Sequence, residues 1–143
     1  MTTEKLVISQ ILNWLNSKIQ SEELELPCFI SLGSPLYTTG EGIWVQLSGK
    51  AQPTQKYLRG RITSTLSCSL YYRLTDAHIN GIEAVMLLPS ETLENFLLTN
   101  KPQLEDFKIN KFIQTNGGVP FSRGDDGTLI YQSLWQIDFE VIK

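Results

Sequence analysis

The chain's one histidine, His78, lies two residues after Asp76, and this pair is the closest approach to an acid–base couple in the sequence. Such a pair supports acyl transfer only when a serine or cysteine nucleophile is presented nearby, for example in a GxSxG turn. The chain contains no GxSxG motif. A histidine just before a predicted helix is typical of a surface or capping residue. We therefore expect no catalytic residue and no enzymatic activity.

Motifs for metals and cofactors are absent or incomplete. Asp125 and Asp126 could contact a cation, but Asp-Asp-Gly is more typical of a tight turn. The segment 40–42 (GEG) lacks the third glycine and the following helix of a dinucleotide-binding loop. Cys28 and Cys68 have no CxxC neighbour that could help to hold zinc, and the sequence favours two buried thiols over a disulfide. We expect no metal site and no cofactor.

Charge is distributed unevenly along the chain. Residues 42–75 contain five basic side chains and no acidic one, whereas the segments before and after them carry net negative charge. The basic segment is either the solvated face of a long strand, or a surface that meets acidic groups of a neighbouring copy or a polyanion. The candidate interface residues are Lys50, Lys56, Tyr57, Arg59, Arg61, Arg73, Arg123, Asp125 and Asp126.

Two long periodic segments dominate the predicted fold. Near the N-terminus, apolar residues recur at helical spacing and predict an amphipathic helix that packs on a sheet; they are Ile8, Ile11, Leu12, Leu15 and Ile19. Residues 57–73 alternate almost strictly and predict a strand with Leu66, Cys68, Leu70 and Tyr72 on one face. Its length far exceeds the usual five or six residues, which favours a bend or an extended β-hairpin arm around residues 49–60.

Shorter signals complete the order of elements as α-β-β-β-α-β-β. We expect short strands at 28–31 and 43–47, a turn over 49–55, a helical region over 76–97 that Pro89 breaks or kinks, and closing strands. The first closing strand alternates Phe107, Ile109 and Ile113, and the last one covers 135–141. A Gly- and Asp-rich stretch over 116–128 predicts a mobile loop.

These elements predict one α+β domain over residues 1–143. Its antiparallel β-sheet of four to five strands carries the N-terminal helix and the central helix on one face. The first twenty residues lack the apolar core of a signal peptide, and the apolar run from Ala84 to Leu88 is too short to span a bilayer. We expect no membrane association and synthesis in the cytoplasm.

The order of these elements resembles a known family. The N-terminal amphipathic helix, the long strand that ends in CSLYYR, the helix after it and the closing segment SRGDDGTLIYQSLWQIDFEVIK are similar to the tail terminator proteins of long-tailed phages, also called minor capsid or head-tail joining proteins. The resemblance implies a homo-hexameric ring in the virion that ends the tail tube and joins it to the head connector protein. It also implies that DNA passes through the ring without sequence readout, and that the tail tube protein is a second partner.

Two other functions stay open. The segment 56–61 (KYLRGR) mixes cations with an aromatic ring, so the basic strand 56–73 could serve a nucleic-acid-binding module. The sequence pI of about 5.1 argues against a dedicated nucleic-acid binder. An adaptor of another tail-like assembly would share the features of a tail terminator.

Overall fold

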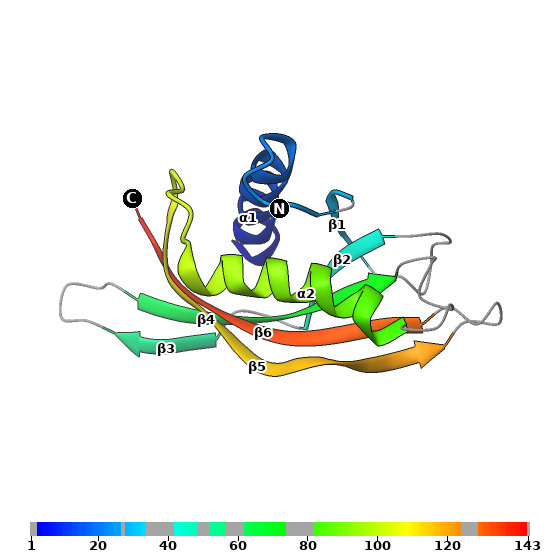
Figure 1. The fold of residues 1–143 in the computed structure, drawn as a ribbon. Helices are drawn as coiled ribbons and strands as arrows, with labels where there is room; N and C mark the ends of the chain where they lie inside the picture. The colour runs from blue at the N-terminus through cyan, green and yellow to red at the C-terminus, as the bar shows by residue number, and fades with distance from the viewer. Residues whose placement is uncertain are drawn as a thin grey trace.

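The computed structural model describes residues 3–26, 28–33, 42–48, 52–56, 62–73, 82–123 and 129–142 (Figure 1). In chain order the elements are α1 (Thr3–Gln20), β1 (Ile30–Leu32), β2 (Gly42–Leu47), β3 (Gln52–Lys56), β4 (Ile62–Arg73), α2 (Ile82–Thr99), β5 (Phe107–Arg123) and β6 (Leu129–Val141).

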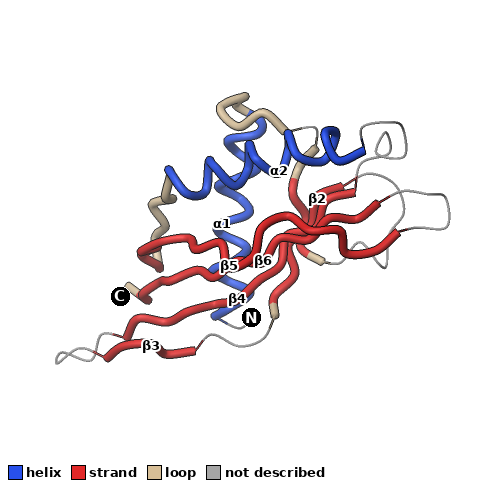
Figure 2. The backbone as a smooth tube through the Cα atoms, turned by 60° about the horizontal axis from the view of Figure 1, so that its bottom comes forward, coloured by secondary structure: helices blue, strands red, loops and turns tan. Residues whose placement is uncertain are grey.

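The strands form one sheet with the order β1-β2-β4-β6-β5, and β3 joins it by pairing with β4. Both helices lie on the same face of the sheet (Figures 1 and 2). The predicted α+β class with two helices on one face is therefore confirmed. Two details differ from the predicted antiparallel sheet of four to five strands. The sheet has six strands, and β1 runs parallel to β2, so the sheet is mixed.

Strand β4 is the centre of the sheet. It pairs with β6 along one side, from Thr63 to Arg73, and with β2 and β3 end to end along the other. The predicted face is confirmed, since Leu66, Cys68, Leu70 and Tyr72 are all buried toward the helices. Residues 57–61 of the predicted strand lie outside the described residues.

Strand β3 corrects the prediction of a turn over residues 49–55. Its pairing register with β4 shifts between Pro53 and Gln55. Proline cannot donate a ladder hydrogen bond, so within sheets it is found on edge strands and at bulges, and β3 offers both conditions. Pro53 was read as a turn signal, but at this position it is compatible with a strand.

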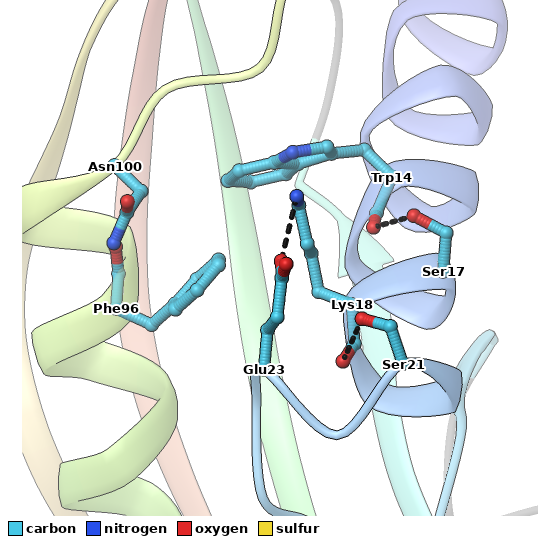
Figure 3. Close-up of polar contacts among 7 residues, drawn as sticks. All are labelled: Trp14, Ser17, Lys18, Ser21, Glu23, Phe96 and Asn100. Atoms are coloured by element: carbon cyan, nitrogen blue, oxygen red, sulfur yellow. Dashed lines mark hydrogen bonds and ion pairs between the residues drawn. The ribbon is translucent and has the colours of Figure 1, made fainter.

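The helix-facing side of the sheet and the two helices share one apolar core. The predicted stripe of α1 is buried from Ile8 to Leu15. Between the helices, the centre of the Trp14 ring lies 5.3 Å from that of the Phe96 ring (Figure 3). The Trp14 ring also stacks on the ring of Phe112 from β5, with 6.4 Å between the ring centres. A cavity of only about 30 Å³ remains among the apolar side chains. The core is thus close-packed, as expected for a protein interior.

Strand β5 differs from its prediction in phase and in length. Phe107 and Ile109 face the core as predicted, but the register shifts before Lys111, so that Phe112 is buried in place of Ile113. A β-bulge adds one residue and reverses the alternation beyond it. The prediction of a loop over 116–128 is wrong for residues 116–123, which continue β5, while residues 124–128 lie outside the described residues.

Helix α2 runs through Pro89 without ending, so the predicted break is wrong, while the alternative of a kink at Pro89 stays a prediction. A proline inside a helix costs roughly 3 kcal/mol because it removes one hydrogen bond and crowds the preceding turn. Leu93 and Leu97, which follow Pro89 on one side of the helix, are buried against the core. Their burial opposes that cost, since each buried leucine contributes roughly 1.5–3 kcal/mol.

Two adjacent leucines of α2 test this packing. Leu97 is 6% exposed and Leu98 is 54% exposed. We expect Leu97→Ala to lower the free energy of unfolding by about 2–5 kcal/mol, because it removes buried methyl groups and leaves a cavity. Leu98→Ala is the matched control and should change it by less than about 0.5 kcal/mol. Urea unfolding measures both values, and equal losses would contradict the placement of α2.

Candidate functional site

Most of the predicted interface residues lie outside the described residues. These are Lys50, Tyr57, Arg59, Arg61, Asp125 and Asp126. Asp76 and His78, for which no catalytic role is expected, also lie outside the described residues. The backbones of Lys56 and Arg123 form the last residues of β3 and β5. Lys56 and Arg73 therefore belong to neighbouring strands, and Arg73 is the one predicted residue whose side-chain surroundings can be given.

Arg73 lies on the face of the sheet opposite the helices, which we call the open face. Its guanidinium carbon lies 5.2 Å from the centre of the Trp44 ring, a cation–π contact. Trp44, Tyr71 and Ile130 form a small buried apolar cluster here, and the Gln132 amide donates a hydrogen bond to the Tyr71 hydroxyl at 3.2 Å. Arg73 is thus held by its own domain. The predicted solvated face of β4 is only partly exposed.

Farther along the open face, the strands are joined by polar side chains. The Thr65 hydroxyl donates a hydrogen bond to Asp138 at 2.7 Å, and the Lys111 ammonium lies 3.9 Å from the same carboxylate. The Asn110 amide donates to the Glu140 carboxylate at 3.5 Å. These cross-strand pairs link β4, β5 and β6. Lys111 and Asp138 are opposite in charge, and the other pairs are joined by hydrogen bonds.

A second polar cluster lies beneath α2, on the covered face. The Trp135 indole N–H and the Gln114 amide donate hydrogen bonds to the Ser133 hydroxyl at 2.7 and 3.3 Å. Glu94 reaches this group from α2. Burial raises the pKa of its carboxyl, hydrogen bonds from Ser133 and Gln114 lower it, and the charge of Glu91 raises it. The balance is a pKa above the ordinary value of 4.5.

The cluster contains groups that are buried without a hydrogen-bond partner. The Tyr72 hydroxyl and the Oε1 atom of Glu94 both have none. Burial, and after it the charge of Glu94, raise the pKa of Tyr72 well above its usual value, and burial raises the pKa of the Cys68 thiol to about 12. Neither group can act as a base or nucleophile near neutral pH.

Two further features of the described residues concern metals and thiols. Within the described ranges, no group of three His, Cys, Asp or Glu side chains is placed to hold a metal ion. Cys28 and Cys68 are both free thiols, and Cys68 is buried on β4 as predicted, whereas Cys28 is only partly buried.

A shallow groove of about 450 Å³ lies between α1 and β1. We call it the α1–β1 groove; its lining residues are Asn13, Asn16, Ser17, Gln20, Phe29, Ile30 and Ser31. The Asn16 amide donates to the Ile30 carbonyl at 3.0 Å, and the Ile30 N–H donates to the Asn16 carbonyl oxygen at 2.8 Å. One side chain thus makes both bonds that a neighbouring strand would make.

Sequence reasoning missed this groove. Its polar residues follow one side of α1, where Asn13, Asn16, Ser17 and Gln20 recur at helical spacing. The available signal for a groove was that this side of α1 is rich in amides and hydroxyls and carries no charge. An ordinary solvated helix surface has the same composition. Only the position of β1 beside α1 makes it a groove.

Comparisons with known proteins do not identify the chain. It matches no protein-family model and no curated protein. Of the helices that the structure describes, none combines the length and the apolar character required to cross a bilayer.

Asn16 should hold β1 in place. Asn16→Ala removes both hydrogen bonds to Ile30, and we expect it to lower the free energy of unfolding by about 1–3 kcal/mol. Asn13→Ala, one turn earlier in the same groove, changes an exposed residue and should cost less than about 0.5 kcal/mol. Amide hydrogen exchange should also become faster at Ile30. Unchanged exchange at Ile30 would show that the Asn16 contact is not formed in solution.

Glu94 should make stability depend on pH. Its folded pKa is raised, so the folded chain holds a proton that the unfolded chain loses near pH 4.5. Stability should therefore fall as the pH rises from about 4.5 through the folded pKa. The groups that face Glu94 are Tyr72 on β4, Gln114 on β5, Ser133 on β6 and Glu91 on α2.

The matched variants are Glu94→Gln and Glu91→Gln. Glu94→Gln stays neutral and should flatten this fall, whereas the exposed Glu91→Gln should preserve most of it. Urea unfolding between pH 4 and 8 tests both. A wild-type stability that rises over this range, with no difference in Glu94→Gln, would contradict the raised pKa.

Proposed function

We propose that this chain is the subunit of a ring that ends the tail tube of a long-tailed phage and joins it to the head connector. The observation that supports this most is the placement of two different strand edges. The β3–β4 hairpin extends from one end of the sheet, and β1 lies near the other (Figure 1). Within the described residues, β3 pairs only with β4 and β1 pairs only with β2.

Two different surfaces on one subunit favour a ring. A contact between unlike surfaces is heterologous, so every copy can bind one neighbour on each side, and the chain of contacts closes when the rotation between copies allows it. A two-fold dimer would instead use one self-complementary surface. The hairpin at one end and the edge at the other are suited to head-to-tail contacts.

The proposed partners and location follow from the resemblance to tail terminators. They are the tail tube protein and the head connector protein, in the virion, after synthesis in the host cytoplasm. The ring acts by binding alone, and DNA passes through it without base contacts. The basic residues of segment 42–75 then attract acidic surface on the neighbouring copy.

The experiment is a measurement of solution mass by light scattering over a range of protein and salt concentrations. We expect the 16.2 kDa chain to assemble as concentration rises into particles of about six subunits, the usual number for the family it resembles. The double variant Arg59→Glu with Arg61→Glu should remain folded and stay monomeric at concentrations where the wild type is a ring, because it reverses two charges of the basic segment.

The matched control is Lys101→Glu with Lys108→Glu, which reverses the same number of charges at exposed positions outside that segment. It should assemble like the wild type. Normal assembly of the Arg59→Glu, Arg61→Glu variant would refute the role of charge in the ring. A wild-type monomer that binds DNA with strong salt dependence would instead support the nucleic-acid module.

A further inference from the structure

We propose that Glu94 is a proton-operated switch, which holds the second half of helix α2 on the sheet when it is protonated and favours its release when it is ionised. The proposal concerns residues 91–99 of α2 and the strand residues beneath them. It does not depend on the proposed ring. It also goes beyond the pH dependence of global unfolding, because it assigns the proton-linked opening to one element.

The polar cluster beneath α2 includes hydrogen-bonded groups of strands β5 and β6. The Ser133 hydroxyl accepts from the Trp135 indole at 2.7 Å and from the Gln114 amide at 3.3 Å. It donates to the Asn116 carbonyl at 3.4 Å. Glu94 reaches Ser133 and Gln114 from the helix. Its carboxyl group is therefore a polar link between α2 and the sheet.

One carboxyl oxygen of Glu94 has no hydrogen-bond partner. This atom, Oε1, is buried, and the hydroxyl of Tyr72 on β4 is buried without a partner as well. Tyr72 is 0% exposed, so its hydroxyl is away from the protein surface. An ionised carboxylate with a bare buried oxygen loses hydration that no protein group replaces, whereas the neutral acid loses much less. The seated position of α2 therefore favours the protonated form of Glu94.

No cation among the described groups that face Glu94 offsets a negative charge on it. These groups are Tyr72 on β4, Gln114 on β5, Ser133 on β6 and Glu91 on α2 itself. Burial has the largest effect and raises the pKa of Glu94, hydrogen bonds from Ser133 and Gln114 lower it, and the charge of Glu91 raises it. The resulting pKa lies above 4.5, in agreement with the geometry.

Side-chain packing holds α2 on the sheet, whereas ladder hydrogen bonds hold the strands together. Leu93 and Leu97, which precede and follow Glu94, are buried in the core. Pro89 cannot donate the backbone hydrogen bond of its position, which weakens the helix before these residues. Proteins open in cooperative units whose opening free energies range from low values up to that of the core strands. The second half of α2 can therefore open while the sheet stays intact.

Helix α1 would remain in place when α2 opens. Asn16 binds Ile30 of β1 through two hydrogen bonds, and the apolar stripe of α1 is buried. The Trp14 ring contacts Phe96 of α2, with 5.3 Å between the ring centres (Figure 3), but it also stacks on Phe112 of β5. Release of α2 would remove the first of these ring contacts and keep the second.

Native-state amide hydrogen exchange between pH 4.5 and 8 tests the switch. In the wild type, the protection factors of residues 91–99 should fall as the pH rises, by up to about tenfold for each pH unit between 4.5 and the raised pKa of Glu94. The fall is expected because the seated helix holds a proton that the released helix loses. Above the raised pKa the protection should stay level, since Glu94 is then ionised in both forms.

Low concentrations of urea separate local opening from global unfolding. Global unfolding exposes most of the chain, so exchange through it depends steeply on urea, whereas release of one helix exposes little surface. Residues 91–99 should therefore be less protected than the amides of β4 and β6, and they should respond less to urea. Equal protection and equal urea dependence in helix and strands would overturn the proposal, because α2 would then open only with the whole domain. A wild-type profile that is independent of pH would overturn it as well.

The matched variants are Glu94→Gln and Glu91→Gln. Glu94→Gln cannot ionise, so the protection of residues 91–99 should no longer change with pH. Glu91→Gln removes a charge from an exposed position one turn earlier and should preserve most of the fall. A fall that persists unchanged in Glu94→Gln would assign the effect to another group and overturn the proposal. Circular dichroism shows whether each variant is folded, and the wild-type profile decides the case if one is not.

Discussion

Hydrogen bonding on both sides of β4 is the interaction on which the fold depends. β6 pairs with one side of β4 from Thr63 to Arg73, and β2 and β3 share the other side. Every other strand reaches the sheet through one of these three partners. Since side chains alternate along a strand, the register of β4 decides which residues of its neighbours face the helices. A slip by one residue would exchange Leu66, Cys68, Leu70 and Tyr72 for Thr65, Ser67, Ser69 and Tyr71.

The two faces that this register creates have different roles. On the covered face, α1 and α2 bury an apolar core, and a polar cluster around Ser133 and Glu94 lies under α2. On the open face, hydroxyls, amides and a few charges bind one another across strands. Among the described strands, β1, β3 and β5 are the edges of the sheet.

The strongest sequence patterns predicted the elements that are controlled by local periodicity. The stripe of α1, the alternation of β4 and the alternation of Trp135, Ile137 and Phe139 on β6 all reappear as buried faces. Patterns failed where tertiary pairing overrides local preference. The bulge before Lys111 changes which residue of β5 is buried, and packing of α2 carries the helix through Pro89.

The α1–β1 groove and the polar cluster around Ser133 and Glu94 could not be predicted from the sequence, because both depend on tertiary contacts. Asn16 becomes a substitute for a neighbouring strand only because β1 lies beside α1, parallel to β2. Glu94 has a raised pKa only because α2 places it over β5 and β6. Both properties depend on residues that are distant in the sequence. The basic segment was visible in the sequence, but most of its cations lie outside the described residues.

Assembly into a closed ring is the central claim, and imaging tests it most directly. Negative-stain electron microscopy of the purified chain, at concentrations where light scattering shows association, should reveal rings with a central opening and one uniform number of subunits. Uniform closure is expected when a single heterologous contact repeats with a fixed rotation. Isolated single subunits at every concentration, or open filaments of variable length, would contradict the claim.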